Sequence, residues 1–181
     1  MLNSVVEPVG DRKVGAIINP NFASYTVAEV EVVSDSPYWI ELRVPGEMKA
    51  VLTAEKMLAL FTAGIASETR EAIMTAFREL LENAIEHGCR LDKSKSVWVS
   101  FVRLKSVVIC QIKDPGEGFD PAQLNHAAVN NPADEPLRHA HLREEKGVRA
   151  GGYGLLLATR LVDELVYNEQ HNEAVFVKYL A

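Results

Sequence analysis

The 181-residue chain contains only two cysteines, Cys89 and Cys110. Two cysteines are too few for a disulfide framework or a four-ligand zinc site. The sequence also shows no basic-then-apolar leader and no long apolar span at either end. From these absences we expect a cytoplasmic protein that does not insert into a membrane.

Positive charge is also scarce. The chain has 19 Lys and Arg against 25 Asp and Glu, which gives a net charge of -6. The anionic surfaces of nucleic acids and membranes would not attract such a chain at long range. With 48% hydrophobic and 24% charged residues, the composition is typical of one globular domain. We therefore expect proteins and a small ligand as partners, without direct binding to nucleic acid.

Periodicity and turn residues predict two parts. Residues 1–36 form an N-terminal extension of unknown role, in which two β-rich runs at 14–18 and 25–33 allow a β-hairpin. Residues 37–181 form the main domain. Its predicted strands are at 38–44, 97–104 and 107–113, followed by a closing hairpin of 165–169 with 174–180. Its predicted helices are at 47–63 and 67–88, and leucines between Leu155 and Leu165 mark a third long helix. This order predicts an α+β fold, a two-layer sandwich whose mixed or antiparallel sheet has helices on one face.

The second predicted helix carries Glu79 and Asn83, which are four residues apart and therefore project from one face about one turn apart. An Asn oxygen suits Mg²⁺ when phosphates and water fill its other positions, and a carboxylate beside it could accept a proton. A solvated stripe near a helix end is the alternative explanation. Glu82 and Glu86 fall on another stripe and are interpreted as solvated surface, and His87 as a residue that packs at the helix end.

Two glycine-containing segments follow. Asp114 stands where a strand ends, and its carboxylate could accept a hydrogen bond from the exocyclic amine of adenine. Gly116 and Gly118 would let the backbone approach a base, although the same residues also suit an ordinary tight turn. Farther on, residues 150–154 lead into a helix, where exposed N–H groups could bind phosphate. A plain glycine linker is the alternative here, and no Lys-Ser/Thr follows to make a P-loop.

Between these segments lie residues 120–150, a long polar stretch with little apolar periodicity. Loops of this length are commonly functional lids or disordered, and the position between the two glycine segments predicts a lid over the phosphates. Its basic residues are candidate charge partners for phosphate, although each could equally be an ordinary solvated side chain. These residues are Arg138, Arg143, Lys146 and Arg149.

Three motifs together resemble the ATP-binding fold shared by gyrase, heat-shock chaperone ATPases, histidine kinases and MutL-type proteins, the GHKL or Bergerat-type fold. They are Glu-x-x-x-Asn-Ala-x-x-His-Gly at 79–88, Asp-x-Gly-x-Gly-Phe-Asp-Pro at 114–121 and Gly-Tyr-Gly-Leu at 152–155. The pattern looks most like that of the anti-sigma-factor serine kinases, over about residues 38–180.

The resemblance implies ATP and Mg²⁺ as cofactors, with Glu79 as the catalytic base and Asn83 as the metal ligand. It implies nucleotide contacts from Asp114, Gly116, Gly118, Gly152, Gly154 and Leu155. It also implies a homodimer that phosphorylates a serine of a small anti-sigma antagonist, with a sigma factor as the competing partner.

Chain length favours this branch of the superfamily, because the gyrase, chaperone and mismatch-repair ATPases need a transducer domain after the nucleotide site. A histidine kinase would carry phosphoacceptor helices before the ATP domain, yet no His precedes His87. An ATP-gated binding module with little or no phosphotransfer is the alternative, and Glu79 favours the enzyme because binding alone needs no base. A structural domain with a dead site is the third hypothesis.

Overall fold

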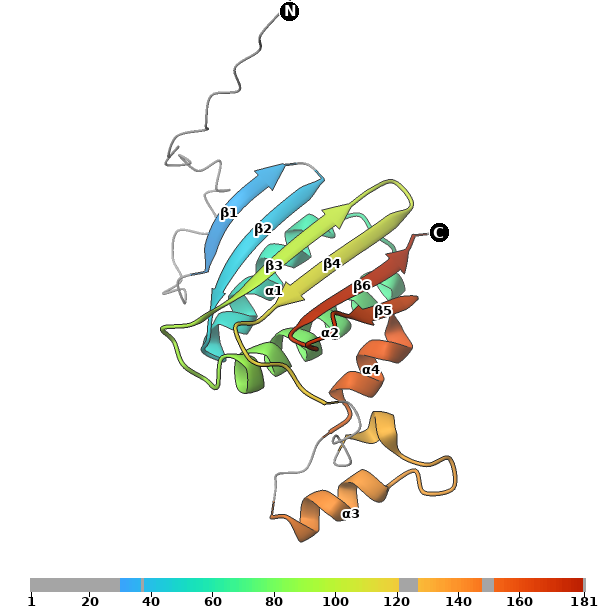
Figure 1. Ribbon diagram of the computed structural model, residues 1–181. Helices are drawn as coiled ribbons and strands as arrows, with labels where there is room; N and C mark the ends of the chain where they lie inside the picture. Colours follow the sequence, from blue (N-terminus) through green and yellow to red (C-terminus); the bar gives the residue numbers. More distant parts are fainter. Residues whose placement is uncertain (1–29, 37, 121–126, 148–151, 181) are drawn as a thin grey trace, which may run out of the picture.

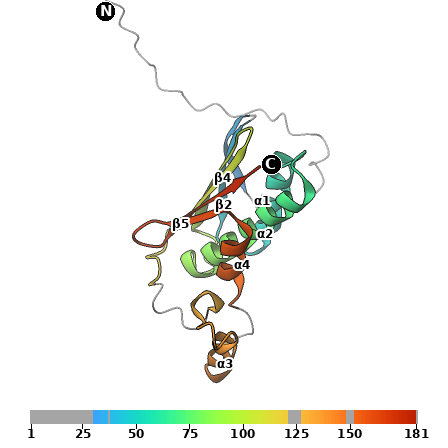
Figure 2. The ribbon, with the colours of Figure 1, turned by 90° about the vertical axis from the view of Figure 1, so that its right-hand side faces the viewer.

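The computed structural model describes residues 30–36, 38–120, 127–147 and 152–180. Its centre is a six-stranded antiparallel sheet with strand order β1-β2-β3-β4-β6-β5. The strands are β1 (Glu31–Ser36), β2 (Trp39–Pro45), β3 (Ser96–Arg103), β4 (Val107–Lys113), β5 (Glu164–Tyr167) and β6 (Glu173–Tyr179). Helices α1 (Lys49–Phe61), α2 (Ser67–Asn83) and α4 (Gly154–Leu161) cover one face (Figures 1 and 2). The predicted α+β sandwich is confirmed, with an antiparallel sheet.

Alternation along the strands decides which face of the sheet meets the helices. In β3, Val97, Val99 and Phe101 are buried, whereas Trp98 between two of them is 47% exposed. The buried side chains join Phe77 of α2 in one core. Because side chains on a strand point to opposite faces in turn, the apolar set fixes the register of the sheet against the helix layer.

Helix α2 does not end as a regular α-helix. Residues Ala84–Gly88 form a π-helical turn, in which the N–H of Cys89 donates to the carbonyl of Ala84 at 2.8 Å. The predicted helix to Gly88 is therefore continuous but changes its winding over the last turn. Such wide turns rotate the side chains that follow, and they are frequent at functional sites.

Helix α4 is shorter than the sequence predicts. The apolar spacing from Leu155 to Leu165 favours one helix, but α4 ends at Leu161, and Leu165 lies on β5, in agreement with the predicted hairpin strand at 165–169. Directly after the helix, the carboxylate of Asp163 accepts a hydrogen bond of 2.6 Å from the backbone N–H of Tyr179 on β6. Pairing with β6 thus overrides the helical period of the leucines.

The sheet begins inside the stretch that the sequence analysis treats as an extension. Strand β1 pairs with β2, with Glu31 opposite Arg43, and forms one edge of the sheet. The predicted run at 25–33 overlaps this strand only at its last three positions. The other expectations for residues 1–29, including the β-hairpin, fall outside the described residues.

Residues 127–147 contain regular structure that periodicity does not predict. A 3₁₀ turn, Ala128–Asn130, and helix α3, Arg138–Glu145, lie in this region, and Figure 1 shows α3 set apart from the sheet and the other helices. Helix α3 has no apolar stripe, so its sequence gives no helical signal. Across the described part of the chain, no helix has both the length and the apolar character to cross a membrane.

Candidate functional site

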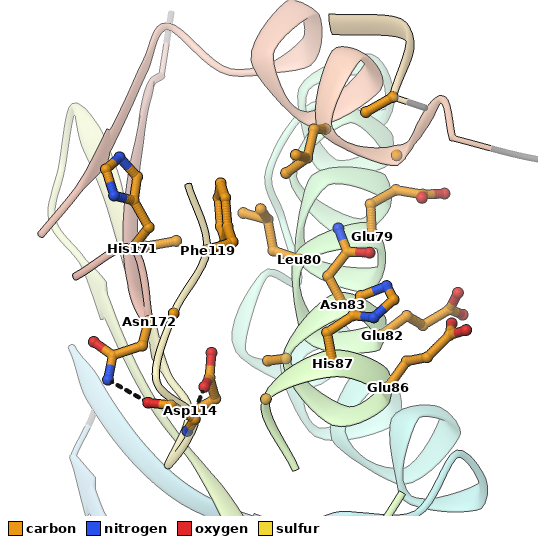
Figure 3. A pocket seen from close by; sticks show the side chains of 18 of the residues that line it. Glu79, Leu80, Glu82, Asn83, Glu86, His87, Asp114, Phe119, His171 and Asn172 are labelled. Atoms are coloured by element: carbon orange, nitrogen blue, oxygen red, sulfur yellow. Dashed lines mark hydrogen bonds between the residues drawn. The ribbon is translucent and has the colours of Figure 1, made fainter. Parts of the chain in front are cut away.

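A pocket of about 860 Å³ opens between the C-terminal half of α2 and the loops that follow β4 and β5. Figure 3 shows the α2 side chains on one wall and Asp114, Phe119, His171 and Asn172 on the other. The volume lies in the range of small-molecule sites. All eight residues predicted to bind nucleotide or act in catalysis line this pocket: Glu79, Asn83, Asp114, Gly116, Gly118, Gly152, Gly154 and Leu155.

Glu79, Asn83 and Gly154 meet at one corner of the pocket. Glu79 and Asn83 lie one turn apart on α2, and Gly154 is the first residue of α4. A Cβ atom on Gly154 would collide with the carboxylate of Glu79 and would lie 3.7 Å from the side-chain nitrogen of Asn83. The missing side chain therefore brings a carboxylate and an amide up to a helix N-terminus, where free N–H groups favour an anionic ligand.

Asp114 follows the last residue of β4, and hydrogen bonds fix both its side chain and its backbone. Its carboxylate accepts a hydrogen bond from the N–H of Gly116 at 2.8 Å, while its backbone N–H donates to the carbonyl of Asn172 at 3.0 Å. Burial raises the pKa of the Asp114 carboxyl, and the hydrogen bond from Gly116 opposes that shift. Among the described residues the carboxylate accepts this single hydrogen bond, so it retains acceptor capacity for a ligand.

Glycines let the chain close tightly around Asp114. A Cβ on Gly88 would run into the Asp114 carboxylate, and one on Gly116 would lie 2.9 Å from the Cα of Gly88. Gly118 has a φ of 80°, and a Cβ there would overlap the carbonyl of Gln170. These glycines are required by contacts within the protein, in addition to the close approach of a ligand that the sequence analysis proposes.

An aromatic group on the sheet side of the pocket was not found from the sequence. The Phe119 and Tyr167 rings lie 5.5 Å apart between centroids, and the His171 ring lies 5.2 Å from the first and 5.8 Å from the second. Burial raises the pKa of Tyr167 to about 12, and its hydroxyl has no hydrogen-bond partner among the described residues. A buried hydroxyl without a partner favours a polar ligand or water in this pocket. Phe119 stands in the motif at 114–121, but no motif marks Tyr167 or His171, and the three rings meet only when the β5–β6 hairpin closes.

Three residues on α2 and its last turn were misinterpreted. Glu82 and Glu86 are half-buried and line the pocket, so they are not merely solvated surface. His87 is exposed and also lines the pocket, so its predicted packing at the helix end is wrong. The π-helical turn explains the later two positions, because it rotates residues 86 and 87 relative to a regular α-helix.

The region predicted as a lid supplies two basic residues to the pocket. Arg143 and Lys146 line it, whereas Arg138 is exposed and lies 3.7 Å from Glu135. Arg149 falls outside the described residues. Whether either lining cation meets a phosphate stays a prediction.

Helix α3 is attached to the glycine segment through His139. The His139 ring is fully buried and packs edge-on against Tyr153 at a centroid distance of 4.4 Å. Its Nδ1 lies 2.6 Å from the amide nitrogen of Asn131, whose oxygen accepts the backbone N–H of His139. Burial and the charge of Arg143 lower the pKa of His139. Because Tyr153 directly precedes Gly154, this contact links α3 to the start of α4.

Thiol and clustered-metal chemistry do not fit the site. Burial, and then the charge of Asp114, raises the pKa of Cys89 to about 11, and burial raises that of Cys110 as well. Both side chains are therefore protonated thiols near neutral pH, unsuited to act as nucleophiles. In the described ranges, no group of three or more His, Cys, Asp or Glu side chains is arranged to hold a metal ion.

The fold and the pocket agree with the comparison to known families. A model for the histidine kinase-like ATPase domain matches residues 44–178, and the chain belongs to this family of GHKL-type ATP-binding domains. The chain is also similar to the serine-protein kinase RsbW of Oceanobacillus iheyensis. The two are 27% identical over 146 residues, which covers 79% of this chain and 87% of that protein. The resemblance to the anti-sigma kinases inferred from the three motifs is thereby confirmed, and the chain is a kinase-like ATPase domain.

Proposed function

We propose that the chain is an ATP- and Mg²⁺-dependent protein-serine kinase that regulates a sigma factor by phosphorylating a small antagonist protein. The observation that carries this proposal is the corner where Glu79, Asn83 and Gly154 meet, with Asp114 in the same pocket. The similarity to a serine-protein kinase supports the choice of reaction. A homodimer in the cytoplasm, bound in turn by the sigma factor and the antagonist, is the corresponding expectation for its assembly.

Each residue has a role that follows from its chemistry. The Asp114 carboxylate accepts a hydrogen bond from the adenine amine, because it offers acceptors only. The backbone N–H groups around Gly152 and Gly154 bind phosphate oxygens at the start of α4. Glu79 lies beside those groups and accepts the proton from the attacking serine hydroxyl.

The donor set suits Mg²⁺ bound mostly by its nucleotide. Asn83 offers one neutral oxygen, and the described residues hold no cluster of acidic or His side chains that would enclose the ion. This matches Mg²⁺, which commonly takes few protein ligands and fills its other positions with phosphates and water. When bound, the ion neutralises charge on the phosphates.

The competing function is an ATP-gated binding module that holds or releases a protein without efficient transfer. Such a module would need Asp114, Asn83 and the glycines, but it would not need a base next to the phosphate-binding end of α4. The position of Glu79 therefore favours the enzyme over the module.

The test is transfer of label from γ-labelled Mg-ATP to small antagonist-type proteins of the source genome. Glu79→Gln is expected to bind ATP and to lose transfer, while Asn83→Ala is expected to lose both. Glu68→Gln makes the same chemical change in an exposed residue at the other end of α2 and serves as the matched control. Binding of ATP with no transfer by the unaltered protein to any such antagonist would favour the binding module. Transfer that survives in Glu79→Gln would rule out Glu79 as the base.

A further inference from the structure

The turn between β5 and β6 is hydrogen-bonded to the turn at residues 114–116. The carbonyl of Asn172 accepts the N–H of Asp114 at 3.0 Å, and the side-chain nitrogen of Asn172 donates to the carbonyl of Gly116 at 2.9 Å. Figure 3 shows Asn172 next to Asp114, with the bond from its amide drawn as a dashed line. Asn172 therefore contacts both ends of the three-residue turn whose middle is Pro115.

A second asparagine fixes the orientation of the first. The side-chain nitrogen of Asn168 donates to the side-chain oxygen of Asn172 at 2.7 Å, and the side-chain oxygen of Asn168 accepts the backbone N–H of Asn172 at 3.1 Å. The carbonyl of Gly116 can only accept, so the nitrogen of Asn172 must face it. This arrangement leaves Asn172 one way to point.

Within the part of the chain that the structure describes, the Asp114 side chain has one hydrogen bond to orient it, although its backbone N–H is also bound to Asn172. Its carboxylate is held by the N–H of Gly116, and Gly116 is in turn held by Asn172. Displacement of Gly116 would therefore move the hydrogen bond that orients the carboxylate. The chain of contacts runs from Asn168 through Asn172 and Gly116 to Asp114, across nearly sixty residues of sequence.

We propose that Asn172 is a positioning residue that sets the preference for adenine by holding the Gly116 turn and, through it, the Asp114 carboxylate. This inference rests on the proposed function, in which Asp114 reads the adenine amine. It assigns base selectivity to the β5–β6 turn as well as to the residue that meets the base.

The expected size of the effect follows from the bonds removed. Asn172→Ala deletes the donor to Gly116 and leaves that carbonyl and the amide of Asn168 without their partners. A net loss of about one to two ordinary hydrogen bonds corresponds to roughly tenfold weaker ATP binding. Asn168→Ala keeps the donor to Gly116 but removes the amide that orients it and the acceptor of the backbone N–H groups of Asn172 and Glu173. Because the bond to Gly116 can still form, a smaller loss of about threefold is expected.

The test compares ATP with ITP, which has a carbonyl oxygen in place of the exocyclic amine. Binding of both nucleotides is measured by calorimetry on the full chain. The unaltered protein is expected to bind ATP at least about tenfold more tightly than ITP. Asn172→Ala is expected to lose about tenfold for ATP and less than twofold for ITP, because ITP makes no favourable contact with Asp114. Glu169→Ala, an exposed truncation in the same turn, should leave the ratio unchanged.

A double substitution separates positioning from direct contact. On an Asp114→Ala background, Asn172→Ala should weaken ATP binding no further, because the group that it positions is gone. Equal losses for ATP and ITP, or losses that add in the double variant, would overturn the inference. If Asn172→Ala does not fold, an ATP-selective loss in Asn168→Ala supports the inference and an unchanged ratio refutes it. Failure of the unaltered protein to bind ATP would instead refute the proposed function.

Discussion

Gly118 and Gly64 offer a matched pair for testing how the site is built. Both have a φ of 80°, in the left-handed region that disfavours a side chain. They differ in the space around them. A Cβ on Gly118 would overlap the carbonyl of Gln170, whereas a Cβ on Gly64 would meet no atom within 4 Å. Comparing Gly118→Ala with Gly64→Ala therefore isolates the packing of the Asp114 loop against the β5–β6 turn.

The two substitutions share one energetic term and differ in another. The left-handed conformation costs a residue with a Cβ about 1 kcal/mol, and both variants incur it. Gly118→Ala must also displace backbone, and overpacking of this kind typically costs about 1–3 kcal/mol. An extra 2 kcal/mol or so in a chain of this size lowers Tm by about 4–8 °C. We expect Gly118→Ala to melt that much below Gly64→Ala.

Calorimetric melting and ATP titration would measure the difference. Gly64 lies beyond the end of α1 and away from the pocket lining, so Gly64→Ala should bind ATP normally. Gly118→Ala should bind ATP more weakly, because the displaced loop carries Asp114. If the loop yields without destabilising the fold, the defect will appear in ATP binding alone. Equal Tm values together with equal ATP affinities in the two variants would refute the packing argument.

Three further predictions concern charge. Because burial raises the Asp114 pKa above its ordinary 3.8, its ionised form destabilises the fold, so Asp114→Asn should raise Tm at pH 7, lose that gain below about pH 4, and weaken ATP binding. The lowered pKa of His139 means that its packing is stable above the ordinary value of 6.5 and is lost as pH falls through the folded-state pKa. Amide protection factors in α3, which correct for the intrinsic pH dependence of exchange, should therefore be lower at pH 5.5 than at 7.5, with exposed His141→Ala as control. Arg143→Ala should weaken ATP binding about threefold and Arg138→Ala should not, as measured by calorimetry.

The sequence predicts those parts of the fold that have a local hydrophobic period of a helix or a strand. Helix α2 begins at Ser67 as expected, because its apolar positions keep the helical period, and β3 and β4 appear within one residue of the predicted bounds. The length of α4 was predicted wrongly because the apolar period continues past Leu161, where the chain instead turns into β5 and Asp163 accepts the N–H of Tyr179. Helix α3 was missed because its few apolar residues form no stripe and its one buried residue is His139.

The candidate site divides in the same way. Residues that stand in short motifs, such as Glu79 and Asn83, could be found because helical spacing alone places them together. His171 and Asn172 could not, since they reach the pocket only through the pairing of β6 with β4, and pairing partners leave no local spacing. Their residue types, an imidazole and an amide in a turn, are equally suited to an ordinary surface hairpin.

The glycines of the site have a structural cause as well as a ligand-binding one. The sequence pattern predicts Gly116 and Gly118 where a base approaches, yet Gly88 and Gln170 already leave no room for side chains there. Gly154 is likewise required by Glu79. Protein contacts that shape the site therefore impose the same residue type that the nucleotide would impose. It follows that substitution of these glycines should impair folding and binding together, and that only a control such as Gly64, with the same φ and open space, can separate backbone strain from the packing that forms the site.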